Sequence, residues 1–113
     1  MGRQRISIDR ETEERVAQRI KALGEKYAGE FPAKSKEIAA IWKNVEAGEE
    51  GALHELYRLV HGLAGSGETF GFAELSSAAR ECEQLLLAGI DTGDLDVEAA
   101  KVRVASVLAQ LIH

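Results

Sequence analysis

Apolar residues recur every three or four positions through the middle of the chain, and this spacing constrains the fold more than any other feature. The series includes Leu53, Leu56, Val60 and Leu63. It places these side chains on one face of an α-helix, where they can pack against a core. The whole sequence contains one proline and few runs of β-branched residues. We therefore predict an all-α protein.

Turn residues divide the apolar pattern into five segments. Phe31-Pro32 interrupts it after the first segment, Gly71 after the third and Gly89 after the fourth. Asp9 can cap the first helix, and either Asp94 or Asp96 can cap the last. The predicted helices are residues 9–28, a segment that follows residue 35 and ends near Val45, residues 52–68, residues 72–87, and a final segment that includes Val97 and Leu111.

Short connections favour antiparallel packing of neighbouring helices. We expect an antiparallel up-down four-helix bundle over residues 31–113, with an additional N-terminal helix as an extension over residues 1–30, in one compact domain. In the fourth helix the spacing leaves two core choices open, namely Ala78 or Ala79 and Leu85 or Leu86. The first helix carries an apolar stripe formed by Val16, Ile20, Leu23 and Tyr27.

Length, charge and composition exclude several classes of protein. The chain has 113 residues, enough for one domain with a core, and its net charge of −5 argues against nucleic acid or an anionic membrane as a partner. No apolar stretch approaches the roughly 20 residues that a membrane span requires. The N-terminus is charged throughout, unlike a signal peptide. The lone Cys82 cannot form an internal disulfide, so we expect a cytoplasmic protein, and one core suggests a monomer.

Three glycines interrupt the third predicted helix beside a histidine. Gly62, Gly65 and Gly67 follow His61 in the run HGLAGSG. Each glycine inside a helix costs about 1 kcal/mol relative to alanine, and Gly65 lies one turn beyond His61 on the same face. We infer that the imidazole is left uncovered so that another protein can approach it closely. Gly67 continues the core spacing, so we expect it to allow close helix packing inside the monomer.

A carboxylate is expected opposite this histidine. If the third and fourth helices fold back on each other at Gly71-Phe72, His61 and Glu83 each lie about 11 residues from the turn, or about 16 Å along either helix axis. Glu83 can then accept a hydrogen bond from Nδ1–H of His61, which leaves Nε2 with an exposed lone pair. A neutral imidazole oriented in this way is a good nucleophile. Arg80 lies one turn nearer the hairpin on the same flank, where it can also pair with Glu83 as an ordinary surface charge.

Further residues surround His61 on its own helix. Arg58 is a neighbour on the same face. No metal site is expected, because His54 is about 10 Å from His61 and neither histidine follows a glutamate by three positions. The predicted partner-binding residues are Tyr57, Gly62, Ala64, Gly65, Ser66 and Glu68.

The run from His61 to Gly67, followed by Phe70-Gly71-Phe72 and Leu75, resembles the histidine phosphotransfer (Hpt) domains of two-component phosphorelays. The family signature is a histidine, a leucine two residues later, Gly-Ser at four and five residues later, and a glycine ten residues later. This chain matches each of these positions. The resemblance covers about residues 31–112.

The resemblance implies a four-helix bundle in which His61 is the phosphorylated residue. Glu83 falls on the position where the family commonly has the Gln or Glu that hydrogen-bonds to the histidine. Ala64 departs from the pattern, because many members have a lysine there that helps to hold the phosphoryl group. Neutralisation of the phosphoryl charge is therefore expected from Arg80, Arg58 or the partner.

The resemblance also implies the reaction and the partners. His61 would accept a phosphoryl group from a receiver-domain aspartate and pass it to another receiver aspartate. The expected partners are response-regulator receiver domains and a hybrid sensor histidine kinase, with Mg²⁺ bound by the receiver and no cofactor bound by this chain. The sequence has no nucleotide-binding motif, so ATP-dependent kinase activity of its own is not expected. The alternative is a degenerate Hpt-like adaptor that binds a signalling partner without phosphotransfer.

Overall fold

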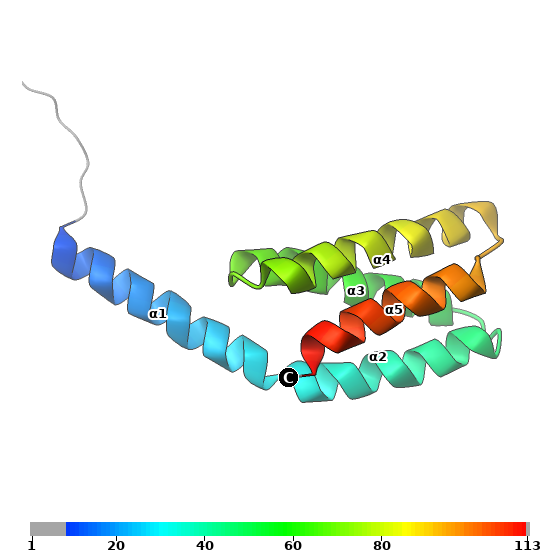
Figure 1. The fold of residues 1–113 in the computed structure, drawn as a ribbon, viewed down its shortest axis with the longest axis horizontal. Coiled ribbons are helices and arrows are strands. Elements are labelled where there is room, and N and C mark those ends of the chain that lie inside the picture. Colours follow the sequence, from blue (N-terminus) through cyan, green and yellow to red (C-terminus); the bar gives the residue numbers. More distant parts are fainter. Residues whose placement is uncertain (1–8, 113) are drawn as a thin grey trace, which may run out of the picture.

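The computed structural model describes residues 9–112 and folds them into five α-helices joined by short connections (Figure 1). No strand occurs in this range, so the all-α prediction is confirmed. Residues 1–8 and 113 of the predicted domain ranges lie outside the described residues. The helices are α1 (Arg10–Gly29), α2 (Phe31–Glu46), α3 (Ala52–Thr69), α4 (Ala73–Thr92) and α5 (Val97–Leu111).

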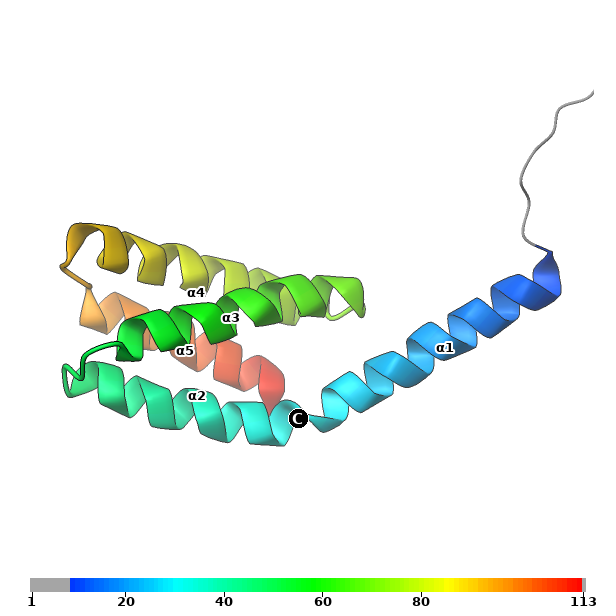
Figure 2. The ribbon, with the colours of Figure 1, turned by 180° about the vertical axis from the view of Figure 1, so that it is seen from behind.

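Helices α2 to α5 pack side by side around one core (Figures 1 and 2). Helix α3 packs against α2 and α4, and α5 packs against α4 and α2. Successive helices run in opposite directions along the bundle, whereas α1 extends away from it and meets it near the C-terminal end of α1. Within residues 9–112, none of the helices combines the length and apolarity needed to cross a membrane.

Buried apolar side chains from α2 to α5, together with Tyr27 of α1, form the core. Ala79 and Leu86 are fully buried in α4, whereas Ala78 and Leu85 are half-buried, which decides between the two open choices. Cys82 lies in the same core, and burial raises the pKa of its thiol to about 12. Burial of each large apolar side chain contributes about 1.5–3 kcal/mol. The other large members are Tyr27, Phe31, Ile38, Ile41, Trp42, Leu56, Val60, Leu63, Leu75, Val104, Val107 and Leu111.

The apolar stripe of α1 is buried at one end. Val16, Ile20 and Leu23 are 47%, 51% and 44% exposed, whereas Tyr27 is 8% exposed. The cause is the direction of α1, which leaves the bundle so that its N-terminal turns have no helix beside them (Figure 1).

Tyr27 lies at the centre of an aromatic cluster. Its ring centroid is 5.2 Å from that of Phe31, 5.1 Å from that of Phe70 and 5.7 Å from that of Phe72. Aromatic pairs at such separations contribute about 0.5–1.5 kcal/mol each beyond the area they bury. The cluster therefore holds the last turn of α1 against the tip of the α3–α4 hairpin.

Two aspartates cap the outer helices. The carboxylate of Asp9 accepts the N–H of Thr12 at 2.7 Å, as predicted. Asp96, rather than Asp94, caps α5 and accepts the N–H of Ala99 at 3.1 Å. Each satisfies a backbone donor that has no partner inside its helix.

Two helix boundaries differ from the prediction. Helix α2 begins at Phe31, because Pro32 occupies the first turn, where a backbone N–H has no partner within the helix. Helix α4 continues through Gly89 to Thr92. A Cβ at Gly89 would lie 3.1 Å from the Cα of Leu95, so glycine is needed inside the helix where the chain returns toward α5.

The backbones of α3 and α4 approach closely at Gly67. A Cβ there would lie 3.3 Å from the backbone nitrogen of Ser76 and 3.4 Å from the carbonyl oxygen of Phe72. The hydroxyl of Ser76 donates to the carbonyl oxygen of Ala64 at 2.7 Å, which adds a second contact at the same level. Gly71, with a φ of +84°, lets the chain reverse direction between the two helices. The predicted packing role of Gly67 is confirmed.

We expect Gly67→Ala to be less stable than the control Gly65→Ala by about 1–3 kcal/mol, because the added methyl group presses on the backbone of α4. At Gly65 a Cβ would meet nothing within 4 Å, so that variant keeps the helix-propensity gain of about 1 kcal/mol. Urea denaturation followed by circular dichroism gives the two free energies of unfolding. Equal values would show that Gly67 does not set the distance between α3 and α4.

Candidate functional site

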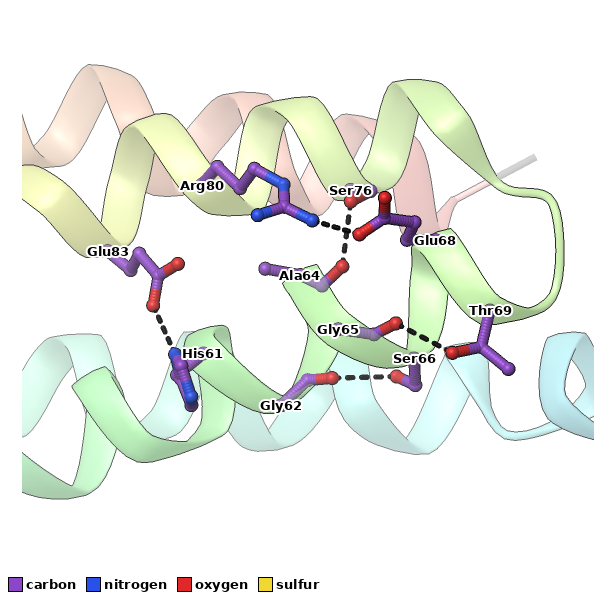
Figure 3. A network of polar contacts seen from close by, with 10 residues as sticks. All are labelled: His61, Gly62, Ala64, Gly65, Ser66, Glu68, Thr69, Ser76, Arg80 and Glu83. Carbon is purple, nitrogen blue, oxygen red and sulfur yellow. Dashed lines mark hydrogen bonds and ion pairs between the residues drawn. The ribbon is translucent and has the colours of Figure 1, made fainter.

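His61 lies in the middle of α3 and faces Glu83 of α4 (Figure 3). Nδ1 of His61 and Oε2 of Glu83 are 2.5 Å apart, so the predicted hydrogen bond is present. The contact follows from the hairpin register. Gly67 lies against Ser76 near the tip, and two turns further along both helices the same register brings His61 level with Glu83.

The two partners of this hydrogen bond differ in exposure. The side chain of His61 is 65% exposed, whereas that of Glu83 is 17% exposed. An ionised carboxylate can only accept hydrogen bonds, so Nδ1 of a neutral His61 carries the proton and Nε2 keeps a free lone pair. Glu83 therefore anchors one edge of the imidazole and leaves the other edge open to solvent.

The ring of Tyr57, one turn before His61, stacks on the imidazole. The two ring centroids are 5.8 Å apart and the planes differ by 18°. Tyr57 was expected to border His61 and to belong to the partner-binding surface, but the stacking of the two rings was not predicted. Its position four residues before a histidine on the same helix is the signal for this contact. Together, the stack and the bond to Glu83 hold both the plane and the rotation of the ring.

Gly62 and Gly65 leave the surface around His61 open. A Cβ at either position would meet no atom within 4 Å. Both glycines are exposed, as is Glu68 one turn beyond Gly65. The bare surface expected from the sequence is therefore present on α3.

In the predicted partner-binding set, Ala64 lies differently from the expectation, whereas Ser66 hydrogen-bonds to the backbone of its own helix, as expected. Ala64 is 2% exposed, so its side chain is not part of the accessible surface. The hydroxyl of Ser66 donates to the carbonyl oxygen of Gly62 at 2.7 Å and lies 2.6 Å from the hydroxyl of Tyr27. Because Ser66 has one proton to donate, Tyr27 is the donor in the second bond. Ser66 thus ties α1 to the C-terminal end of α3.

A comparison with protein families decides what this arrangement represents. A family model for the Hpt domain matches residues 10–113. The chain belongs to the Hpt domain family. Searches of curated proteins and of solved structures gave no match. The family supports a phosphotransfer role in phosphorelays and interaction with receiver domains, and its match includes α1 as well as residues 31–112.

The two candidate cations of this Hpt domain lie on different flanks of α3. Arg80 reaches across from α4 and forms an ion pair with Glu68, not with Glu83 (Figure 3). Arg58 lines a shallow hollow together with Gly62 and Lys34, toward α2. Among residues 9–112, no three His, Cys, Asp or Glu side chains lie close enough together to bind a metal ion.

Replacing Glu83 by alanine is expected to change the tautomer of His61. Without the acceptor, the proton moves from Nδ1 toward Nε2, the form that free histidine prefers, and the lone pair on Nε2 is lost in that fraction of molecules. Nitrogen-15 NMR of the imidazole measures the two forms. Glu81→Ala is the matched control, since Glu81 lies 3.5 Å from Arg103 and has no contact with His61. An unchanged tautomer in Glu83→Ala would remove Glu83 from the site.

Proposed function

We propose that this Hpt domain accepts a phosphoryl group on Nε2 of His61 from a receiver-domain aspartate and passes it to the aspartate of another receiver. The observation that carries the proposal is the hydrogen bond from Nδ1 of His61 to Glu83, with the imidazole 65% exposed. It orients the ring and leaves Nε2 as the nucleophilic atom. The antiparallel up-down packing expected for α2 to α5 presents this ring on the outer face of the hairpin.

In the proposed transfer, the lone pair on Nε2 attacks phosphorus as the bond from phosphorus to the aspartyl oxygen breaks. The aspartate leaves as a carboxylate, and the ring becomes cationic while Nδ1 keeps its proton. The carboxylate of Glu83, 2.5 Å from Nδ1, stabilises this developing positive charge. The reverse steps return the phosphoryl group to a second receiver. Glu83→Ala should therefore slow transfer by about 10- to 100-fold without abolishing it.

Phosphoryl transfer depends mainly on positioning and charge neutralisation. In the proposal the receiver supplies Mg²⁺ and its own cationic side chain, and a hybrid sensor histidine kinase supplies the phosphoryl group at the start of the relay. This chain supplies the nucleophile, its orientation and a docking surface, as a cytoplasmic monomer with no ATP-dependent kinase activity. We assign neutralisation of the phosphohistidine to Arg80, with Arg58 on the other flank as the second candidate.

Docking in this proposal uses the open strip of α3. Gly62 and Gly65 have no side chain to hold a partner away from His61, and the ring of Tyr57 borders the same surface. The glycines let the backbone of a receiver come within contact distance of the imidazole. This need accounts for glycines in a helix interior where each costs about 1 kcal/mol.

The test of the function is phosphorylation by a receiver. Pure protein is mixed with a phosphorylated receiver domain and Mg²⁺, and the label on this chain is checked for the acid lability and base stability of phosphohistidine. We expect label on the wild type and none on His61→Ala, with the helical circular dichroism unchanged. Label retained on His61→Ala would show that another residue is the acceptor.

The same experiment distinguishes phosphotransfer from the alternative function, an adaptor. An adaptor that binds receivers without phosphotransfer would show binding to the receiver but no label with any of several receivers. Ala64→Lys is then the informative variant, because it restores the lysine that many family members have. Label gained by this variant would trace the inactivity to position 64.

Gly65→Leu should lower the rate of transfer from a receiver by at least about 100-fold, since a bulky side chain would fill the surface where the partner approaches. The control is Ala105→Leu on α5, an exposed position on a different helix. Stopped-flow or quench-flow transfer measures both variants. A normal rate in Gly65→Leu would refute the close-approach role of the glycine.

A further inference from the structure

Two polar contacts cross from α3 to α4 on the face that carries His61. His61 is hydrogen-bonded to Glu83, and nearer the hairpin tip Glu68 is paired with Arg80 (Figure 3). Glu68 follows His61 by seven residues, which is two helical turns, so the two side chains lie on nearly the same face of α3. Between them α3 has the buried Ala64 and the exposed Gly65, neither of which has a polar side chain. A carboxylate and the acceptor nitrogen thus lie at the two ends of a strip of α3 that presents no polar side chain of its own.

Arg80 is placed between these two ends. His61 is level with Glu83, so Arg80, three residues nearer the tip, is level with Ala64. Ala64 is about 4.5 Å along the helix axis from His61 and about 6 Å from Glu68. A guanidinium group that reaches Glu68 in one direction therefore has a similar distance to cover toward His61 in the other.

The present pairing of Arg80 is open to exchange. The side chains of Arg80 and Glu68 are 49% and 69% exposed, and pairs exposed to this degree are weak because water and salt compete with them. A phosphoryl group carries a charge of about −1.5 to −2 and three acceptor oxygens. Guanidinium groups bind phosphate with two parallel hydrogen bonds. A phosphoryl group on His61 is therefore a stronger partner for Arg80 than the carboxylate of Glu68.

We infer that Glu68 and the phosphoryl group on His61 compete for Arg80. Glu68 holds the guanidinium while His61 is unmodified, and Arg80 turns to the phosphoryl group after transfer. This inference rests on the proposed function, because it requires His61 to be the acceptor. It gives Glu68 a regulatory role: by holding Arg80 in the unmodified state, it lowers the fraction of His61 that is phosphorylated at equilibrium with a receiver.

The test measures how the phosphoryl group divides between His61 and a receiver domain at equilibrium. The wild type, Glu68→Gln, Arg80→Ala and the double variant are each mixed with the same dilute phosphorylated receiver and Mg²⁺. We expect Glu68→Gln to raise the ratio of phosphorylated to free His61 by about two- to fivefold, the effect of releasing one exposed ion pair. With alanine at position 80, the same substitution should leave the ratio unchanged, because no cation is released.

A second readout follows the guanidinium itself. The Nε–H resonance of Arg80 should shift when the wild type is loaded with phosphoramidate, a small phosphoryl donor that needs no receiver, and should also shift in unmodified Glu68→Gln. The control variant is Glu81→Gln, which removes the partner of Arg103 on another flank of α4 and should change neither readout.

The outcomes distinguish a failure of the inferred competition for Arg80 from a failure of the proposed phosphotransfer function. If Glu68→Gln raises the ratio equally in the Arg80→Ala background, Glu68 acts by direct repulsion of the phosphoryl group and the competition is refuted. An unchanged ratio in both backgrounds refutes it as well. A wild type that takes no label refutes the proposed function, whereas normal labelling without an effect at Glu68 refutes only this inference.

Discussion

The close approach of α3 and α4 at Gly67 determines where the residues of the site lie. With a backbone nitrogen of α4 only 3.3 Å from the position of a Cβ at Gly67, the two helices have little freedom to slide past each other. The register set there is carried along both rigid helices to His61 and Glu83, two turns away. A shift by one residue would move Glu83 by about 1.5 Å along its axis and turn it by about 100°, which would break a 2.5 Å contact.

The site divides the imidazole into a fixed edge and a free edge. On the fixed edge, Glu83 is largely shielded from water and Tyr57 covers a face of the ring. On the free edge, the neighbouring glycines remove side chains that would restrict access. A single histidine can thus be held rigidly and still be reached by a large partner. The stability given up by glycines in α3 is offset by the apolar core below them.

The parts of this arrangement that depend on helical periodicity could be predicted from the sequence. The faces of the helices, the hairpin and the pairing of His61 with Glu83 follow from counting residues along two regular elements. The extent of α4 through Gly89 did not follow, because a glycine is typical of a helix end and the apolar pattern does not show that Leu95 packs against this position. The burial of Ala64 was also missed, since it lies at the edge of the apolar stripe, where a small rotation of the helix decides exposure.

Long exposed side chains set a second limit on prediction. Arg80 has one carboxylate three residues away on its own helix and another across the groove, and sequence spacing ranks the first above the second. In the structure, Glu83 is taken by His61, so Arg80 pairs with Glu68. The partner of Arg80 thus depends on the contact between His61 and Glu83. An interpretation of the sequence that takes each residue separately does not include this dependence.

The aromatic cluster around Tyr27 determines where a shortened form of this domain can begin. A boundary between residues 30 and 31 would separate Tyr27 from the rings of Phe31, Phe70 and Phe72, all of which it contacts. The shortened fragment would carry an apolar patch at the tip of the hairpin, and such patches promote self-association. The last turns of α1 therefore serve as a cover for the end of the bundle. In a recombinant fragment, keeping that cover protects solubility as well as the fold.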